Sequence, residues 1–251
     1  MATWAQKRKV TLALIAIGCF GIVGSLVAYK ILYHPPTCTD GIQNGTEQGI
    51  DCGGGCVRLC VNNFSVPRVA WTRLEQVAPG LYNVAAYIAN PNVSVGAKRA
   101  PYRVVLYDAQ GIQITEYKGT VAIPAHRNTL AFKGSVSVSK RVPVKALFEF
   151  TQTPEWTVEK DVLSAVSISN KDFHDEGDQA SLSVIVKNDN VSEIGITDVY
   201  AILYDKDGNT LGFSKTVLDR IPAYSTVVAP FTWPHGFQNK VISIEVLPVA
   251  Q

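Results

Sequence analysis

The feature that most constrains this chain is an uncharged apolar run near its N-terminus. Val10–Tyr29 reads VTLALIAIGCFGIVGSLVAY and contains neither a charged residue nor a proline. At about 1.5 Å per residue, a helix of this length spans the roughly 30 Å hydrocarbon core of a bilayer. No other window of the sequence is comparable. We therefore expect a transmembrane helix at residues 10–33, which anchors the rest of the chain.

The charges beside this run indicate its orientation. Lys7, Arg8 and Lys9 precede it, and residues 1–9 contain no acidic side chain. Under the positive-inside rule, such a tail stays in the cytoplasm. We therefore predict a single-pass protein of the cell membrane, with a cytoplasmic tail at residues 1–9 and the bulk of the chain outside the cytoplasm.

Two other targeting signals compete with an uncleaved signal-anchor. A cleavable signal peptide has a shorter apolar region and ends in a small-x-small site, which this run lacks. Ile15–Cys19 loosely resembles a lipobox, with Cys19 as the lipid carrier. Position Ala16 is normally a larger aliphatic residue, and the chain stays apolar after Cys19. We favour the anchor and keep a lipoprotein lipidated at Cys19 as an alternative.

The expected helix carries small residues along one side. Gly18, Gly21 and Gly24 are spaced three apart, and Gly21 and Ser25 form a small-xxx-small pair. Small residues allow transmembrane helices to approach closely. The pattern therefore suits a helix that packs against other helices in a membrane assembly. A type IV pilin is disfavoured, because no acidic residue lies near the start of the run.

A cysteine-rich module is expected at residues 34–61, directly after the helix. It holds four of the five cysteines, with the spacing C-x13-C-x3-C-x3-C: Cys38, Cys52, Cys56 and Cys60. So small a segment with few apolar residues needs covalent or metal support. Two disulfides, with three possible connectivities, fit an oxidising compartment. A zinc site is the rival, but zinc sites usually pair two C-x2-C elements.

Oxygen-bearing side chains lie between these cysteines. Asp40, Asn44, Glu47 and Asp51 are separated by glycines, and hard oxygen ligands on such a loop suit Ca²⁺. The D-x-D-x-D-G spacing of an EF-hand is missing. Alternatively, Asp and Asn only initiate turns here. We keep Ca²⁺ as a possible cofactor of this module and predict no other cofactor.

The rest of the chain contains the same unit twice. Asn90-Pro91-Asn92-Val93 matches Asn188-Asp189-Asn190-Val191 at an offset of 98 residues. Val104–Asp108 followed by Gly111 matches Ala201–Asp205 followed by Gly208 at an offset of 97. Ile123-Pro124-Ala125 matches Ile221-Pro222-Ala223 at an offset of 98. Three ordered landmarks at a near-constant offset indicate two homologous domains.

Each unit is expected to be an immunoglobulin-like β-sandwich, with the first at residues 62–152 and the second at 153–251. Short runs rich in Val, Ile, Tyr and Thr alternate with Gly, Pro, Asn and Asp, which is typical of about seven strands per unit. Alternation at Tyr82–Ile88 and at Leu182–Val186 predicts strands with one buried face. The fold class is therefore all-β, behind one helix and a stapled segment.

Three further expectations concern packing. Leu106 and Leu203 lie in the same landmark and should both be buried, and Trp71 should pack in the first core, with the places of Trp156 and Trp233 left open. Residues 151–158 form the expected join between the units. Such a short link keeps two domains close. We expect few contacts to cross it and each sandwich to unfold independently.

Two segments resemble known families. DGIQNGTEQGIDCGGGC, within residues 39–56, is similar to a short cysteine-rich motif of bacterial surface and secreted proteins. The repeated Leu-Tyr-Asp landmark resembles the FxLYD family of bacterial extracytoplasmic sandwiches, with the leading Phe replaced by Val104 and Ala201. The resemblance implies a sandwich fold and an extracytoplasmic location. It implies no shared catalytic activity.

The sequence offers no catalytic constellation, so we predict no catalytic residue and no enzyme activity. No H-E-x-x-H, nucleophile elbow or phosphate loop occurs, and the richest polar cluster is Asp172–Asp178. Beyond the helix and its flanks there are 19 basic and 21 acidic residues, which gives no basic footprint for nucleic acid.

We expect a membrane-anchored protein that presents two sandwiches to a protein or surface partner. The alternative is an accessory subunit of an envelope assembly, such as a pilus or secretion complex; the oligomeric state is left open.

Overall fold

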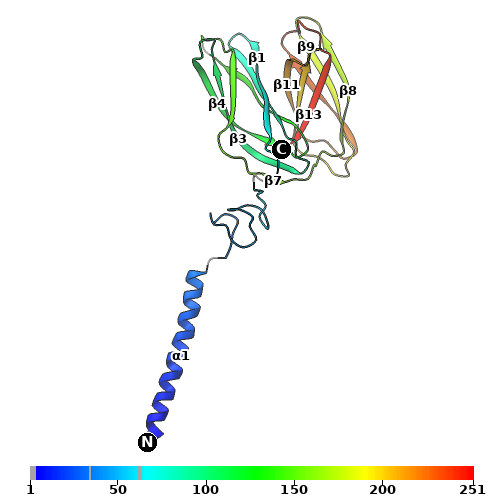
Figure 1. Cartoon of the computed structure of the whole chain (residues 1–251). Coiled ribbons are helices and arrows are strands. Elements are labelled where there is room, and N and C mark those ends of the chain that lie inside the picture. Colours follow the sequence, from blue (N-terminus) through cyan, green and yellow to red (C-terminus); the bar gives the residue numbers. More distant parts are fainter. Residues whose placement is uncertain (1–3, 34, 61–63, 139) are drawn as a thin grey trace. The chain divides into compact units, whose positions relative to one another are not determined.

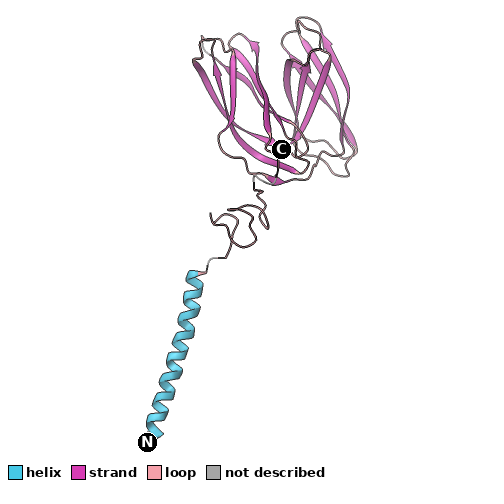
Figure 2. Ribbon diagram, in the orientation of Figure 1, coloured by secondary structure: helices cyan, strands magenta, loops and turns pink. Residues whose placement is uncertain are grey.

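The computed structural model describes residues 4–33, 35–60, 64–138 and 140–251. One helix is followed by a segment without long regular elements and then by antiparallel β-structure (Figures 1 and 2). The chain divides into two compact units, residues 1–56 and 57–251, which are described separately below. The all-β fold class with one N-terminal apolar helix is therefore confirmed.

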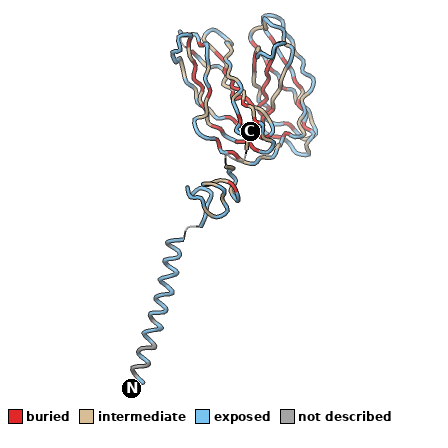
Figure 3. Tube along the Cα trace, viewed as in Figure 1, coloured by how far each residue is buried: buried red, intermediate tan, exposed pale blue. Residues whose placement is uncertain are grey.

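The helix α1 spans Trp4–Leu32. Its window Leu12–Lys30 has a mean hydropathy of 2.3, and none of the residues whose burial is described in this window is buried. Figure 3 shows the helix in the colour of exposed residues along its described part. The helix is thus long and apolar enough to cross a membrane. It begins earlier than expected, because residues 4–9 of the basic tail are also helical.

The first sandwich consists of two facing antiparallel sheets. One sheet has the order β1-β2-β5, formed by β1 (Arg68–Ala78), β2 (Leu81–Ala89) and β5 (Thr129–Ser137). The other has the order β4-β3-β6, formed by β4 (Gln113–Ile123), β3 (Val95–Tyr107) and β6 (Lys145–Phe150). The two-residue strand β7 (Thr157–Val158) pairs with the start of β3.

The second sandwich has the same order of strands. One sheet is β8-β9-β12, formed by β8 (Val166–Asp175), β9 (Ala180–Asn188) and β12 (Ser225–Trp233). The other is β11-β10-β13, formed by β11 (Thr210–Leu218), β10 (Thr197–Tyr204) and β13 (Ser243–Ala250). Within the described residues, each sandwich thus has six main strands, not the seven expected from turn spacing.

Each sandwich has its own apolar core, built by the alternation seen in the sequence. Leu106 and Leu203 are 2% and 0% exposed, in the first and second core respectively, so this expectation is confirmed. Side chains that face the cores alternate with exposed ones, as at Leu182 and Val184 beside Ser183. Buried residues accordingly follow the strands of both sandwiches in Figure 3.

Two expectations about the first core and the join are wrong. Trp71 does not belong to the first core; Trp156 occupies it at 3% exposure, and Trp233 lies in the second core. Leu59 donates its backbone N–H to the carbonyl of Trp156, and β7 pairs with β3. Residues 153–158 therefore pack on the first sandwich and do not start the second.

Candidate functional site

The first repeated landmark is a buried asparagine that closes one end of each sandwich. Asn188 donates from Nδ2 to the carbonyls of Ser192, Ile221 and Pro222, at 3.0–3.1 Å. Asn90 donates in the same way to the carbonyls of Val95 and Pro124, both at 2.8 Å. The bonds to Pro124 and Pro222 explain why the Asn and Ile-Pro-Ala landmarks recur together. In each copy, the asparagine amide donates to a backbone carbonyl of the Ile-Pro-Ala loop and so helps to satisfy it.

The second asparagine of each landmark holds the segment that enters the sandwich. Asn92 donates from Nδ2 to the carbonyl of Ser65 at 2.6 Å and accepts the Ser65 N–H at 2.9 Å. Asn190 donates to the carbonyl of Val162 at 3.5 Å, and residues 65 and 162 are again 97 apart. The landmark is therefore structural in both copies, because its amides are used inside the fold.

The Leu-Tyr-Asp landmark builds a turn between neighbouring strands. The Asp205 carboxylate accepts the backbone N–H groups of Asp207 and Asn209, both at 2.9 Å, and Asp108 accepts those of Gln110 and Ile112. The glycine that follows has a φ of +76° at Gly111 and +78° at Gly208. This left-handed conformation strains any residue with a Cβ atom. The landmark aspartates therefore fix the turn in both copies.

Gly208→Ala is expected to destabilise the second sandwich by about 1–2 kcal/mol, because alanine is strained in the left-handed region. Nothing lies within 4 Å of the Cβ position, so strain alone produces the effect. Gly195→Ala is the matched control, since Gly195 is equally open and no positive φ is recorded there. Thermal unfolding of both variants tests this; equal midpoints would contradict it.

A third apolar cluster joins the two sandwiches. Its buried members come from the outer face of β1-β2-β5 and the outer face of β11-β10-β13: Ala85, Leu130, Tyr200, Ile202, Phe213 and Val249. Phe213 lies 6.1 Å from Phe132 and 6.4 Å from Trp71, between ring centroids. Figure 1 shows the two groups of strands next to each other. The expectation that few contacts connect the sandwiches is therefore wrong.

The repeat shows which residues create this interface. Leu130 is 1% exposed, whereas Val228, which has the same register position in the second sandwich, is 57% exposed. Phe213 corresponds in the same way to Glu116, which faces solvent in an ion pair with Arg103. The outer face of β1-β2-β5 in the first sandwich and that of β11-β10-β13 in the second are thus apolar, and each buries the other.

Polar contacts flank this interface. The carboxylate of Glu245 accepts the hydroxyl groups of Tyr87 at 2.9 Å and Tyr204 at 2.8 Å, one from each sandwich. Burial raises the pKa of both tyrosines, and the bonds to Glu245 raise them further. Arg127 binds Asp161 through Nε and Nη2 at 3.1 and 3.0 Å, which ties the β4–β5 loop to the connecting segment. Because hydrogen bonds and ion pairs are directional, these contacts fix how the two apolar faces are oriented against each other.

At one rim the interface contains a buried carboxyl group. Glu75 Oε2 accepts the backbone N–H of Phe213 at 3.4 Å, while Oε1 is buried and has no hydrogen-bond partner. Burial raises the pKa of Glu75 from 4.5 to about 7, although the Phe213 N–H and the charge of His235 oppose the increase. Next to it, His235 Nε2 lies 3.1 Å from the carbonyl oxygen of Gln76. Sequence reasoning missed this pair because Glu75 and His235 are 160 residues apart.

All four cysteines of the module are disulfide-bonded, as expected. Cys38 and Cys56 form one bond, with their Cα atoms 5.7 Å apart, and Cys52 and Cys60 are disulfide-bonded as well. Cys38 and Cys56 also lie near Glu47 in a metal-like group, but their sulfurs bond to each other and cannot act as thiolate ligands. Disulfides, and not zinc, therefore support this segment.

The four oxygen-bearing residues of the module hold its turns. Asp51 accepts the Gly41 N–H with both carboxylate oxygens, and Glu47 accepts the N–H groups of Asn44 and Asp51. Hydrogen bonds from Asn44 and the loop backbone lower the pKa of Asp40. Within the described residues, the carboxylates of Asp40, Glu47 and Asp51 do not meet as a three-residue ligand set. Ca²⁺ binding stays a prediction.

The small residues of the helix are all open to their surroundings. Nothing lies within 4 Å of the Cβ positions of Gly18, Gly21 and Gly24, and the Ser25 hydroxyl donates to the Ile22 carbonyl at 2.8 Å. Cys19 is free and exposed in the same helix. Space for a neighbouring helix therefore exists along this side, and neither helix packing nor lipidation of Cys19 is tested by these contacts.

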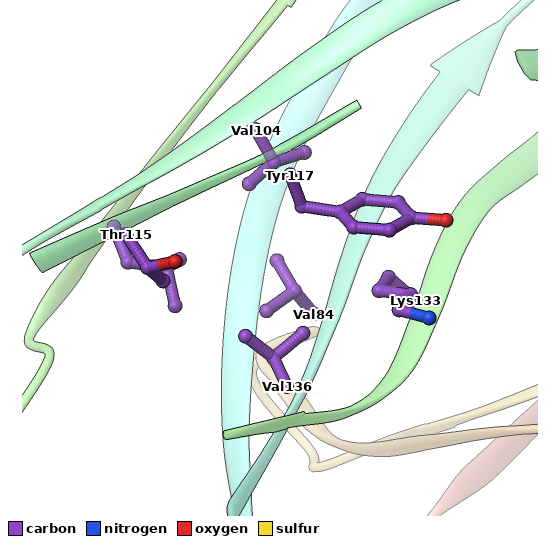
Figure 4. A pocket seen from close by; sticks show the side chains of 7 residues that line it. Val84, Val104, Thr115, Tyr117, Lys133 and Val136 are labelled. Atoms are coloured by element: carbon purple, nitrogen blue, oxygen red, sulfur yellow. The ribbon is translucent and has the colours of Figure 1, made fainter. Parts of the chain in front are cut away.

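Among the described residues, two of the hollows lie on the first sandwich. Figure 4 shows the smaller one, with Tyr117 and Lys133 near Val84, Val104 and Val136. The Lys133 ammonium lies 4.6 Å from the Tyr117 ring centroid, and the cavity of about 10 Å³ holds one water molecule at most. The second is an open hollow of about 500 Å³, which is ligand-sized; it is lined by Val66, Arg68, Ala89, Asn90, Pro91 and Asn128.

The acidic cluster Asp172–Asp178 of the second sandwich does not converge on a common binding site among the described residues. His174 Nε2 lies 3.1 Å from Asp172, and both side chains are more than half exposed. Asp175 accepts the N–H groups of Gly177 and Phe237 and so fixes a turn. Among the other histidines, His126 has a φ of +62° in a loop, and His34 lies outside the described residues.

Comparisons with known proteins do not assign a family. No family model matches the chain, and no curated protein matches it. Among solved structures, a β-glucuronidase from glycoside hydrolase family 2 aligns with 68% of this chain and 24% of its own, at 10% identity and a TM-score of 0.25. This chain thus spans about a quarter of that enzyme's length. A likeness this distant carries no conclusion about activity.

Proposed function

We propose that this protein is a non-enzymatic, membrane-anchored display protein, which holds two docked sandwiches outside the cytoplasm to bind a protein or a surface. The observation that carries the proposal is the apolar interface between the sandwiches. Because this interface docks the two domains, they can present one continuous binding surface behind a single helix. The disulfides support an oxidising location. The FxLYD-like landmarks and the cysteine-rich motif support it further.

The hollow beside the start of β1 is the candidate contact surface. Arg68 and Val66 are exposed there, and Val66 is 60% exposed, whereas Asn90 and Asn128 use their amides inside the fold. An exposed cation beside an apolar side chain suits a partner that presents a carboxylate next to an aliphatic group. A partner captured from native membranes should bind Arg68→Glu more weakly than the wild type.

A second candidate is an accessory subunit of an envelope assembly, favoured by the open small-residue side of α1. Extraction in mild detergent followed by sizing separates the two functions. A display protein elutes as a monomer or small oligomer, and an assembly subunit elutes in a defined large complex. Gly21→Leu should dissociate such a complex into smaller species, because the larger side chain blocks the close approach of helices.

The proposed topology predicts which part of the chain a protease reaches. Protease added to intact cells or spheroplasts should remove the region after Tyr33 and leave the tail with Lys9 protected, because the basic flank stays inside. Immunoblotting with an N-terminal tag and a C-terminal tag measures this. Protection of the C-terminal tag in intact spheroplasts, with digestion after lysis, would overturn the topology.

A further inference from the structure

The rim of the interface brings an ionisable side chain of one sandwich against the backbone of the other. Glu75, on β1, accepts the N–H of Phe213 on β11. His235, in the loop before β13, lies against the carbonyl of Gln76 on β1. A carbonyl only accepts, so His235 Nε2 carries a proton and donates. Both edge strands, β1 and β11, thus have a backbone group bound by the other sandwich.

We propose that Glu75 and His235 form a proton-sensitive latch that sets how tightly the two sandwiches dock. The geometry points to this because Glu75 Oε1 is buried at the interface and has no hydrogen-bond partner. A charged carboxylate with an unsatisfied buried oxygen is costly, whereas a neutral carboxyl group is much less so. Undocking returns the group to water and removes this cost.

The direction of the effect follows from the two protonation states. Burial raises the pKa of Glu75 from its ordinary 4.5 to about 7 in the docked structure, so this form binds a proton more tightly than a form in which Glu75 is in water. Docking is therefore tightest below about pH 4.5, weakens as the pH rises, and loses the full contribution above about pH 7. The docking equilibrium should change by roughly 100-fold over this range.

The other charged groups at the interface do not produce this effect. Glu245 is held by two tyrosines whose pKa values are raised, so those phenols stay protonated across the range. Asp161 is paired with Arg127 and Asp198 with Lys215. His235 is the charged neighbour that acts on Glu75, and its positive charge lowers the Glu75 pKa.

Hydrogen exchange of the full chain in detergent, followed by mass spectrometry, tests the latch with Glu75→Gln. Glutamine keeps the acceptor for the Phe213 N–H but carries no charge. Peptides from β10, β11 and β2 should exchange at least tenfold faster in the wild type than in Glu75→Gln at pH 8, and at nearly equal rates at pH 4. Comparison at each pH cancels the intrinsic dependence of exchange. The exposed control Glu193→Gln should match the wild type throughout.

His235→Gln provides a second readout that a purely structural role would not change. The glutamine Nε2 can take the place of the imidazole Nε2 and donate to the Gln76 carbonyl, but it carries no positive charge, so the pH at which docking weakens should rise. A ratio of wild-type to Glu75→Gln exchange that is constant from pH 4 to 8 would overturn the latch. If Glu75→Gln does not fold, carboxyl titration of wild-type Glu75 by NMR decides: a midpoint near 4.5 would overturn it.

Discussion

Leu130→Asp should separate the two sandwiches while leaving both folded. Leu130 is 1% exposed on the outer face of β5, within the cluster that joins the sandwiches and outside both cores. A buried carboxylate without a partner costs several kcal/mol, and undocking relieves this cost by exposing the group to water. Calorimetry of the full chain should therefore show one transition in the wild type and two in the variant.

The repeat supplies the control for this experiment. Val228→Asp places the same charge at the same register position of the second sandwich, where the side chain is 57% exposed. Exposed substitutions usually change stability by less than about 0.5 kcal/mol. Val228→Asp should keep the single transition. If Leu130→Asp also kept it at the wild-type midpoint, the interface would not hold the sandwiches together.

Leu203→Ala and Leu106→Ala should each lower the stability of the whole docked pair. Both leucines are buried in a core, and truncating a buried leucine costs about 2–5 kcal/mol. Because the interface couples the sandwiches, each variant should shift one shared transition. Differential scanning calorimetry of the two single variants measures this.

The same truncations in the Leu130→Asp background reveal the coupling. There, Leu203→Ala should lower only the transition of the second sandwich, and Leu106→Ala only that of the first. A shared shift in both backgrounds would mean that the sandwiches have one common core. Separate shifts in both backgrounds would mean that the interface contributes no coupling.

Much of the fold can be predicted because it repeats and alternates. The landmarks at Asn90 and Asn188 recur since each side chain binds the same neighbouring loop. The glycines at 111 and 208 recur since both turns need a positive φ. Period-two alternation marks the core face of β9. These patterns arise from short stretches of neighbouring residues, so they can be recognised in the sequence alone.

The interface could not be predicted from alternation alone. β10 is buried along seven consecutive residues, because one face lies in the second core and the other, including Tyr200 and Ile202, lies against the first sandwich. An unbroken apolar run shows that both faces are covered but does not show by what. The expectation for Trp71 fails for another reason: the register of β1 against β2 shifts between Val69 and Trp71, so Val69 packs on the first core and Trp71 packs on the interface cluster. A comparison of the two copies position by position contains the signal, since Phe213 lies where the first copy has the charged Glu116.

The module behind the helix marks another limit of the sequence. Cysteine spacing predicts disulfides but leaves three connectivities open, and Cys38–Cys56 is a pair that only the structure provides. Oxygen-bearing residues on a glycine-rich loop suit both an ion and a network of backbone bonds. In this chain Asp51 and Glu47 accept loop N–H groups, and Ca²⁺ binding stays a prediction.

Residual dipolar couplings test the docking of the two sandwiches most directly. Backbone amide couplings would be measured for both sandwiches in one aligned sample of the deuterated full chain in detergent micelles, at pH 5. Two domains that tumble as one body share a single alignment tensor. The interface of Leu130, Ile202 and Phe213 predicts that couplings from both sandwiches fit one tensor with the orientation seen here. Two tensors of different magnitude, one for residues 68–150 and one for 166–250, would contradict it.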